Sequence, residues 1–87
     1  MKKEKKILLN ENSYKIVIDR QEYIFKDECL SGRELLIRAG KIPPEKFQLN
    51  KKLRNGKIIK VNYYEWIHFT VSDFEKFITI PLDQTEG

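Results

Sequence analysis

The strongest constraint on the fold of this 87-residue chain is a signal for one short helix near its middle. The stretch Ser31-Gly32-Arg33-Glu34 matches a capping box, in which the Ser31 hydroxyl accepts a hydrogen bond from the Glu34 backbone N–H and the Glu34 carboxylate accepts one from the Ser31 N–H. Gly40 and the diproline that follows it end the pattern. We therefore predict a helix over residues 32–39. So short a helix needs tertiary packing, because isolated helices of this length are marginal in water.

Two strand patterns precede this helix. In residues 13–19, Tyr14, Ile16 and Ile18 alternate with Lys15, Val17 and Asp19, and residues 22–27 are predicted to form a second strand. Alternation with period 2 predicts a strand with one buried face. The link between the two, Arg20-Gln21, is polar and very short. The two strands are therefore predicted to form an antiparallel hairpin.

The chain after the helix carries a second hairpin signal and an aromatic stretch. Residues 46–53 and 58–61 flank Asn55-Gly56, a tight-turn signal because both residues tolerate positive φ. The following aromatic-rich segment is interpreted as an irregular crossover that buries Ile67 and Phe69.

The order of hairpin, helix, hairpin, crossover and final strand predicts an α+β fold. One helix on one face of a four- or five-stranded mixed sheet buries the apolar side of both elements. We expect a β-grasp in which the last strand, residues 75–82, lies between the others and pairs in parallel with the first. Two registers of that strand stay open: Ile78 and Ile80 face the core, or Phe77 and Thr79 do.

These signals divide the chain into one domain with an extension at each end. A chain of 87 residues is too short for two stable cores. We predict a flexible basic arm over residues 1–12, a β-grasp domain over residues 13–82, and a flexible tail over residues 83–87.

Charge and cysteine content indicate the compartment and the kind of partner. The formal net charge is +4, but acids and bases are interleaved, and much of the excess lies in the first six residues, MKKEKK. The lone Cys29 cannot form an internal disulfide, which fits a reducing cytoplasm. No apolar run approaches the ~20 residues of a membrane span, and no signal peptide is recognisable. We therefore expect a cytoplasmic protein without a membrane partner.

Four stretches of the sequence resemble one protein family in their order and spacing: YKIVIDRQEYIF, LSGRELLIRAGKIPPEKFQL, VNYYEWIHF and FEKFITIPLD. The most telling piece is the helix opening, where Ser31-Gly32-Arg33-Glu34 matches a TGRE-type pattern that ends in Ala39-Gly40 before the prolines. The second is the acidic-aromatic FEKF stretch before the last strand. Over residues 14–82 the chain resembles the multiubiquitin family of bacterial ubiquitin-like β-grasp domains.

The resemblance implies a protein modifier, which is a substrate of enzymes and not itself an enzyme. It implies four partners: a ubiquitin-activating-like enzyme, a ubiquitin-conjugating-like enzyme, a metal-dependent deubiquitinase-like protease, and target proteins. The activating enzyme would consume ATP and place AMP on the Gly87 carboxylate. The acyl group would pass as a thioester or related ester to the conjugating enzyme, and then to a target amine. The activating enzyme would recognise the tail Asp83, Gln84, Thr85 and Glu86. No bound cofactor is implied.

The tail both fits this chemistry and departs from the family pattern. Glycine at the tip lets the backbone approach an adenylation site closely. A modifier tail usually ends in Gly-Gly, however, whereas Glu86 precedes Gly87 here. Either the enzyme channel carries complementary Lys or Arg residues, or Gly87 is not the mature end. The third strand departs too, because its expected outward residues are Gln48, Asn50 and Lys52, and ubiquitin receptors read an apolar patch.

The aromatic crossover leaves three interpretations open. Tyr64, Trp66 and His68 could form an exposed docking surface for the activating or conjugating enzyme. Alternatively, Tyr63, Tyr64 and Trp66 could fill a small core or rest against it, or they could stack on nucleic-acid bases. A docking surface that works without the tail would make the chain a non-conjugated β-grasp adaptor.

Nucleic-acid binding and catalysis have weaker support. Basic residues around Asn55-Gly56 could neutralise phosphates, although a solvated hairpin is the simpler interpretation. Cys29 as a nucleophile would need a base, and the only histidine, His68, shows no triad spacing. One Cys and one His also make a poor metal site. We predict no catalytic residue and no metal ligand.

Overall fold

The computed structural model describes residues 13–71 and 73–82 of the chain. Neither helical segment in these two ranges has the length and apolar character that a membrane crossing requires. The elements in chain order are β1 (Tyr14–Ile18), β2 (Gln21–Phe25), β3 (Cys29–Ser31), α2 (Gly32–Arg38), the 3-10 turn η1 (Pro44–Lys46), β4 (Phe47–Leu53), β5 (Ile58–Val61), β6 (Trp66–His68) and β7 (Phe74–Pro81).

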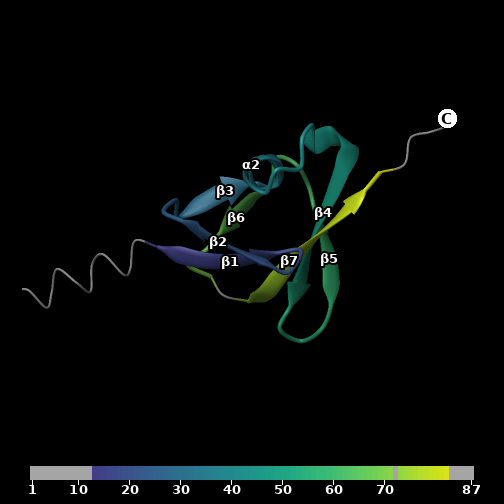
Figure 1. Cartoon of the computed structure of the whole chain (residues 1–87). Coiled ribbons are helices and arrows are strands. Elements are labelled where there is room, and N and C mark those ends of the chain that lie inside the picture. The colour runs from purple at the N-terminus through teal and green to yellow at the C-terminus, as the bar shows by residue number, and fades with distance from the viewer. Residues whose placement is uncertain (1–12, 72, 83–87) are drawn as a thin grey trace, which may run out of the picture.

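Five of these strands form one mixed sheet in the order β2-β1-β7-β4-β5. β7 lies between β1 and β4, parallel to the first, with Ile18 opposite Phe77, and antiparallel to the second, with Leu49 opposite Thr79. The predicted α+β class is confirmed, and so is the central, parallel position of the last strand. Figure 1 shows α2 and the short β3–β6 pair on one side of this sheet.

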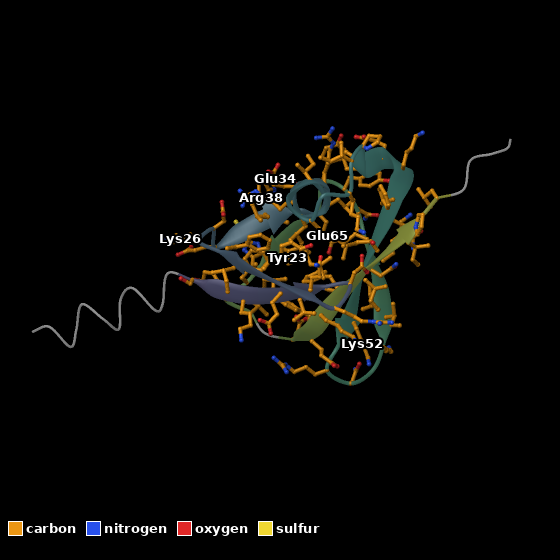
Figure 2. All side chains as sticks on the ribbon, viewed as in Figure 1. Tyr23, Lys26, Glu34, Arg38, Lys52 and Glu65 are labelled. Atoms are coloured by element: carbon orange, nitrogen blue, oxygen red, sulfur yellow. The ribbon has the colours of Figure 1, made fainter. Side chains whose placement is uncertain are left out.

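The helix begins where the capping signal predicts, but only one of the two capping hydrogen bonds predicted for this described segment is formed. The Ser31 Oγ accepts a hydrogen bond from the Glu34 N–H at 3.1 Å. The Glu34 carboxylate accepts a hydrogen bond from Arg38 Nε, one turn further along the helix, at 3.3 Å (Figure 2). Beyond the helix, Gly40 adopts a positive φ of 78°, and the Lys41 N–H donates to the Leu36 carbonyl at 2.9 Å. This is the hydrogen bond of a glycine-terminated helix end.

The core lies between the helix and the sheet. The side chains of Leu35, Leu36 and Phe77 are fully buried there. The burial of Phe77, together with 45% exposure of Ile80, selects the register in which Phe77 and Thr79 face the helix side. The other register would have placed the Phe77 side chain in water, which is costly wherever one face of a strand is buried.

The structure corrects the predicted first turn. The turn consists of Asp19-Arg20, not Arg20-Gln21, and both residues have positive φ, 51° and 70°. Two such residues in succession match the right-handed twist of a hairpin. The displaced turn also places the Asp19 carboxylate over β7, where it accepts hydrogen bonds from the Thr79 N–H at 2.8 Å and from the Thr79 hydroxyl. Lys41 Nζ lies 3.5 Å from the same carboxylate.

The aromatic crossover is more regular than predicted. Ile67 and Phe69 are buried, as expected, but residues Trp66–His68 form the strand β6, which pairs with β3. Both strands have only three residues, and each buries a single side chain, Leu30 or Ile67. So short a strand offers too little alternation for its period to be recognised in the sequence. We refer to this β3–β6 pair below as the ribbon.

Candidate functional site

The three residues predicted as a docking surface are all exposed. Tyr64 is 78% exposed, Trp66 is 60% exposed, and His68 is also on the surface. The interpretation that these aromatic residues fill the core is therefore wrong for Tyr64 and Trp66. Whether they dock an enzyme stays a prediction.

The ribbon explains why Trp66 and His68 point to the same side. They are two residues apart on β6, and the residue between them, Ile67, points into the core. Alternate residues of a strand face the same way. The register places Trp66 opposite Ser31 and His68 opposite Cys29. The outer side of the ribbon therefore carries all four side chains beside the helix entrance.

The pairing of Cys29 with His68 was not foreseen, because 38 residues lie between them in the sequence. Two such residues alone do not make a metal site. Within the described residues, no group of three or more His, Cys, Asp or Glu side chains is placed to hold a metal ion.

A close approach at Gly32 fixes the segment between β5 and β6. A Cβ atom added at Gly32 would lie 2.5 Å from the Asn62 carbonyl oxygen. The Gly32 N–H donates to the Glu65 carbonyl at 3.0 Å, and the Arg33 N–H donates to the Tyr63 carbonyl at 2.8 Å. The glycine of the helix signal therefore has a second role, which is to let the helix entrance contact this segment.

The two adjacent tyrosines of the segment have opposite environments. Tyr63 packs against the core, and its hydroxyl donates to the Phe47 carbonyl at 2.8 Å. Tyr64 is exposed. The partly buried Tyr63 anchors the backbone to β4, so Tyr64 is presented from a fixed position.

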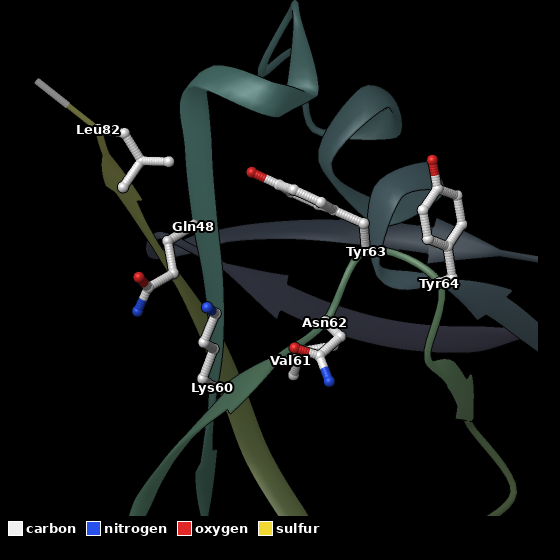
Figure 3. A pocket seen from close by; sticks show the side chains of 7 residues that line it. All are labelled: Gln48, Lys60, Val61, Asn62, Tyr63, Tyr64 and Leu82. Atoms are coloured by element: carbon white, nitrogen blue, oxygen red, sulfur yellow. The ribbon is translucent and has the colours of Figure 1, made fainter. Parts of the chain in front are cut away.

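A groove of about 230 Å³ opens where β5 separates from β4. It connects the exposed Tyr64 with Leu82, the last described residue (Figure 3). The Leu82 N–H donates to the Lys46 carbonyl at 2.8 Å, which holds this end of the described chain against β4. The groove is lined by Gln48, Lys60, Val61, Asn62, Tyr63, Tyr64 and Leu82.

A polar cluster that we did not predict lies beside this groove. Asn50 points to the outer side of β4, as expected, but it is only 5% exposed. Its Oδ1 accepts a hydrogen bond from Gln48 Nε2 at 3.0 Å. Its Nδ2 is buried and, among the described residues, has no hydrogen-bond partner. A buried unpartnered donor costs about 1–3 kcal/mol, so its presence calls for an explanation.

One signal in the sequence could have drawn attention to Asn50. Asparagine is depleted in strands, yet here it occupies the middle of one. Its burial, however, depends on its place between β5 and β7, which lie beside β4 only in the folded sheet.

An exposed ion pair joins the helix to η1. Arg33 Nε lies 2.8 Å from Glu45 Oε2. The hydrogen bond from Arg33 lowers the pKa of the Glu45 carboxyl below its ordinary value, and the same contact raises the pKa of the Arg33 guanidinium. Water screens both groups, so the pair adds little to stability.

The predicted attachment site lies outside the described residues. This applies to Gly87 and to the tail residues Asp83, Gln84, Thr85 and Glu86. The predicted arm, residues 1–12, lies outside them as well. No protein-family model, curated protein or solved structure matches the chain. The assignment of a function therefore depends on the residues and the geometry described above.

Proposed function

We propose that this chain is a bacterial ubiquitin-like protein modifier with a β-grasp fold. The observation that carries the proposal is the sheet order β2-β1-β7-β4-β5 with β1 and β7 parallel, and one helix on one side. This arrangement supports a β-grasp. It agrees with the sequence resemblance to multiubiquitin-type domains, which concerns the same elements.

The course of the last strand supports a conjugated tail. β7 is the central strand of the sheet. The chain just after it is held by the hydrogen bond from the Leu82 N–H to the carbonyl of Lys46, the residue before β4. A segment that follows a firmly held strand can be offered to an enzyme without unfolding the domain. In the proposal, residues 83–87 are that segment, and Gly87 carries the reacting carboxylate.

The proposed chemistry has three steps. The Gly87 carboxylate attacks the α-phosphorus of ATP on the activating enzyme, forming an acyl adenylate and releasing pyrophosphate. An enzyme nucleophile then displaces AMP and forms a thioester or related ester. A target amine finally displaces that nucleophile, and a metal-dependent deubiquitinase-like protease would reverse the attachment. The chain contributes the acyl group and a recognition surface to these steps.

Adenylation tests the proposal directly. The full chain, ATP and the ubiquitin-activating-like enzyme of the same organism are mixed, and exchange between ATP and labelled pyrophosphate is measured. We expect exchange that depends on the chain and is lost when Gly87 is deleted. Lys26→Gln, a change at an exposed position of the domain, serves as the control and should leave exchange unchanged. Exchange that survives deletion of Gly87 would contradict the proposal.

A second candidate function is favoured by the exposed aromatic residues. Tyr64 and Trp66 present large apolar side chains from a fixed backbone, as protein-binding surfaces often do. A non-conjugated adaptor would use this surface and ignore the tail. Deleting residues 83–87 would then leave partner binding intact, while Trp66→Ser would abolish it. A modifier needs the tail whatever the effect of Trp66→Ser.

A further inference from the structure

We infer that the outer side of the five-stranded sheet, at Gln48, Asn50 and Lys60, binds an acidic side chain of a partner protein. These three side chains carry more hydrogen-bond donors than their own acceptors can satisfy. Asn50 Nδ2 is buried and has no hydrogen-bond partner in the described part of the chain, and Gln48 Nε2 uses one hydrogen on Asn50 Oδ1. Lys60 makes no ion pair with any other described residue. A carboxylate supplies only acceptors, which is what this cluster lacks.

The sheet register brings the three donors together. Asn50 lies directly opposite Lys60 on β5, and opposite Ile78 on β7. Side chains at such positions are about 5 Å apart at Cβ. Gln48, two residues before Asn50, points to the same side of β4. In Figure 3 the side chains of Gln48 and Lys60 extend from neighbouring strands along the same side of the groove.

The side chain opposite Asn50 on β5, Lys60, can move. Lys60 is exposed, and exposed side chains change rotamer in picoseconds to nanoseconds. A shift of its flexible stem would make room beside the Asn50 amide without moving the backbone. A carboxylate in that position would accept from Asn50 Nδ2 and pair with Lys60 Nζ. Such charge-assisted hydrogen bonds are roughly twice as strong as neutral ones.

The surroundings favour a carboxylate on a protein over a phosphate of a nucleic acid. Next to the cluster, β7 contributes Ile78 and the exposed Ile80, which lies opposite Gln48. Isoleucines suit apolar neighbours of an acidic residue in a peptide. A nucleic acid needs several free cations, whereas Lys52, the next outward residue of β4, lies 3.9 Å from Glu75. This inference does not rest on the modifier function, because it concerns the free domain.

Side-chain amide signals in nuclear magnetic resonance provide the test. The ¹⁵N-labelled full chain is titrated with an acetylated and amidated Leu-Glu-Leu peptide, and with the Leu-Gln-Leu peptide as its neutral match. We expect saturable shifts of the Asn50 Nδ2 and Gln48 Nε2 signals with the acidic peptide, and binding about tenfold weaker with the neutral one. Equal shifts with both peptides, or none with either, would overturn the inference.

Two variants and a truncation assign the effect. Lys60→Gln touches no core residue and should weaken binding of the acidic peptide about tenfold, and Asn50→Leu should abolish it. Lys26→Gln, an exposed lysine on another part of the domain, should bind as the wild type does. Binding that Lys60→Gln leaves unchanged contradicts the assignment.

The truncation tests whether the chain itself fills the site. Deleting residues 83–87 should leave the chemical shift of the Asn50 side-chain amide unchanged when no peptide is present. A change in that shift would mean that Asp83 or Glu86 of the chain itself is the occupant.

Discussion

The two sides of the five-stranded sheet use the same strands differently. On β4, Leu49 faces the helix and is buried in the apolar core, whereas its neighbour Asn50 faces outward and is buried between Lys60 of β5 and Ile78 of β7. On β7, Phe77 is fully buried while Ile80 is half exposed. The helix side therefore holds the fold together. The outer side keeps hydrogen-bonding capacity that the fold does not use, which is what a binding surface requires.

The largest expected effect separates the two sides along one strand. Phe77→Ala should lower the free energy of unfolding by about 3–5 kcal/mol, because it leaves a cavity in the core. Ile80→Ala, on the same strand, should cost less than about 1 kcal/mol, because its side chain is half exposed. Urea denaturation of both variants measures the difference. Similar losses would mean that the register of β7 is wrong.

The ribbon repeats the contrast between adjacent residues. Ile67→Ala should cost about 2–4 kcal/mol, since it removes a buried side chain. Trp66→Ser should change stability by less than about 0.5 kcal/mol, as surface substitutions usually do. Thermal unfolding compares the pair. A large loss in Trp66→Ser would show that Trp66 supports the fold and is not available as a docking residue.

A substitution at Asn50 tests whether the outer side of the sheet lowers the free energy of unfolding in exchange for binding capacity. Asn50→Leu removes the unpartnered buried amide and should raise the free energy of unfolding by about 1 kcal/mol. Gln48 loses one hydrogen-bond partner but can bond to water, because it is only partly buried. Chemical denaturation measures the change. A loss of about 1 kcal/mol or more would indicate that Asn50 already has a stabilising partner in the free protein.

The smallest expected effect concerns pH and the Arg33–Glu45 pair. Because folding lowers the pKa of the Glu45 carboxyl, the stability from this pair is present above the ordinary pKa of 4.5 and is lost as the pH falls through the folded-state value. Glu45→Gln should therefore lower Tm slightly at about pH 7 and make no difference at about pH 3. A difference that persists in acid would mean that Glu45 acts through packing and not through its charge.

Most of the helix and strand elements can be predicted from the sequence, and individual residues show why. The Ser31 cap and the Gly40 stop are local signals, so the helix bounds follow within one residue. The first hairpin follows from alternation in residues 13–19. The ribbon was missed because Trp66–His68 is too short to alternate, and the Asn50 cluster was missed because it needs the register of three strands. The exposure of Tyr64 beside the anchored Tyr63 likewise depends on one hydrogen bond to β4.

The central claim, that the chain is a modifier joined through its C-terminal glycine, is tested most directly by mass spectrometry. The full chain is incubated with ATP and the ubiquitin-activating-like enzyme, and the enzyme is then analysed intact and after digestion. The account predicts an enzyme adduct one chain heavier, less one water, with the new bond at the Gly87 carboxyl. It predicts no adduct for the variant that lacks Gly87. An unmodified enzyme in the presence of ATP, or an adduct attached through any other residue, would contradict it.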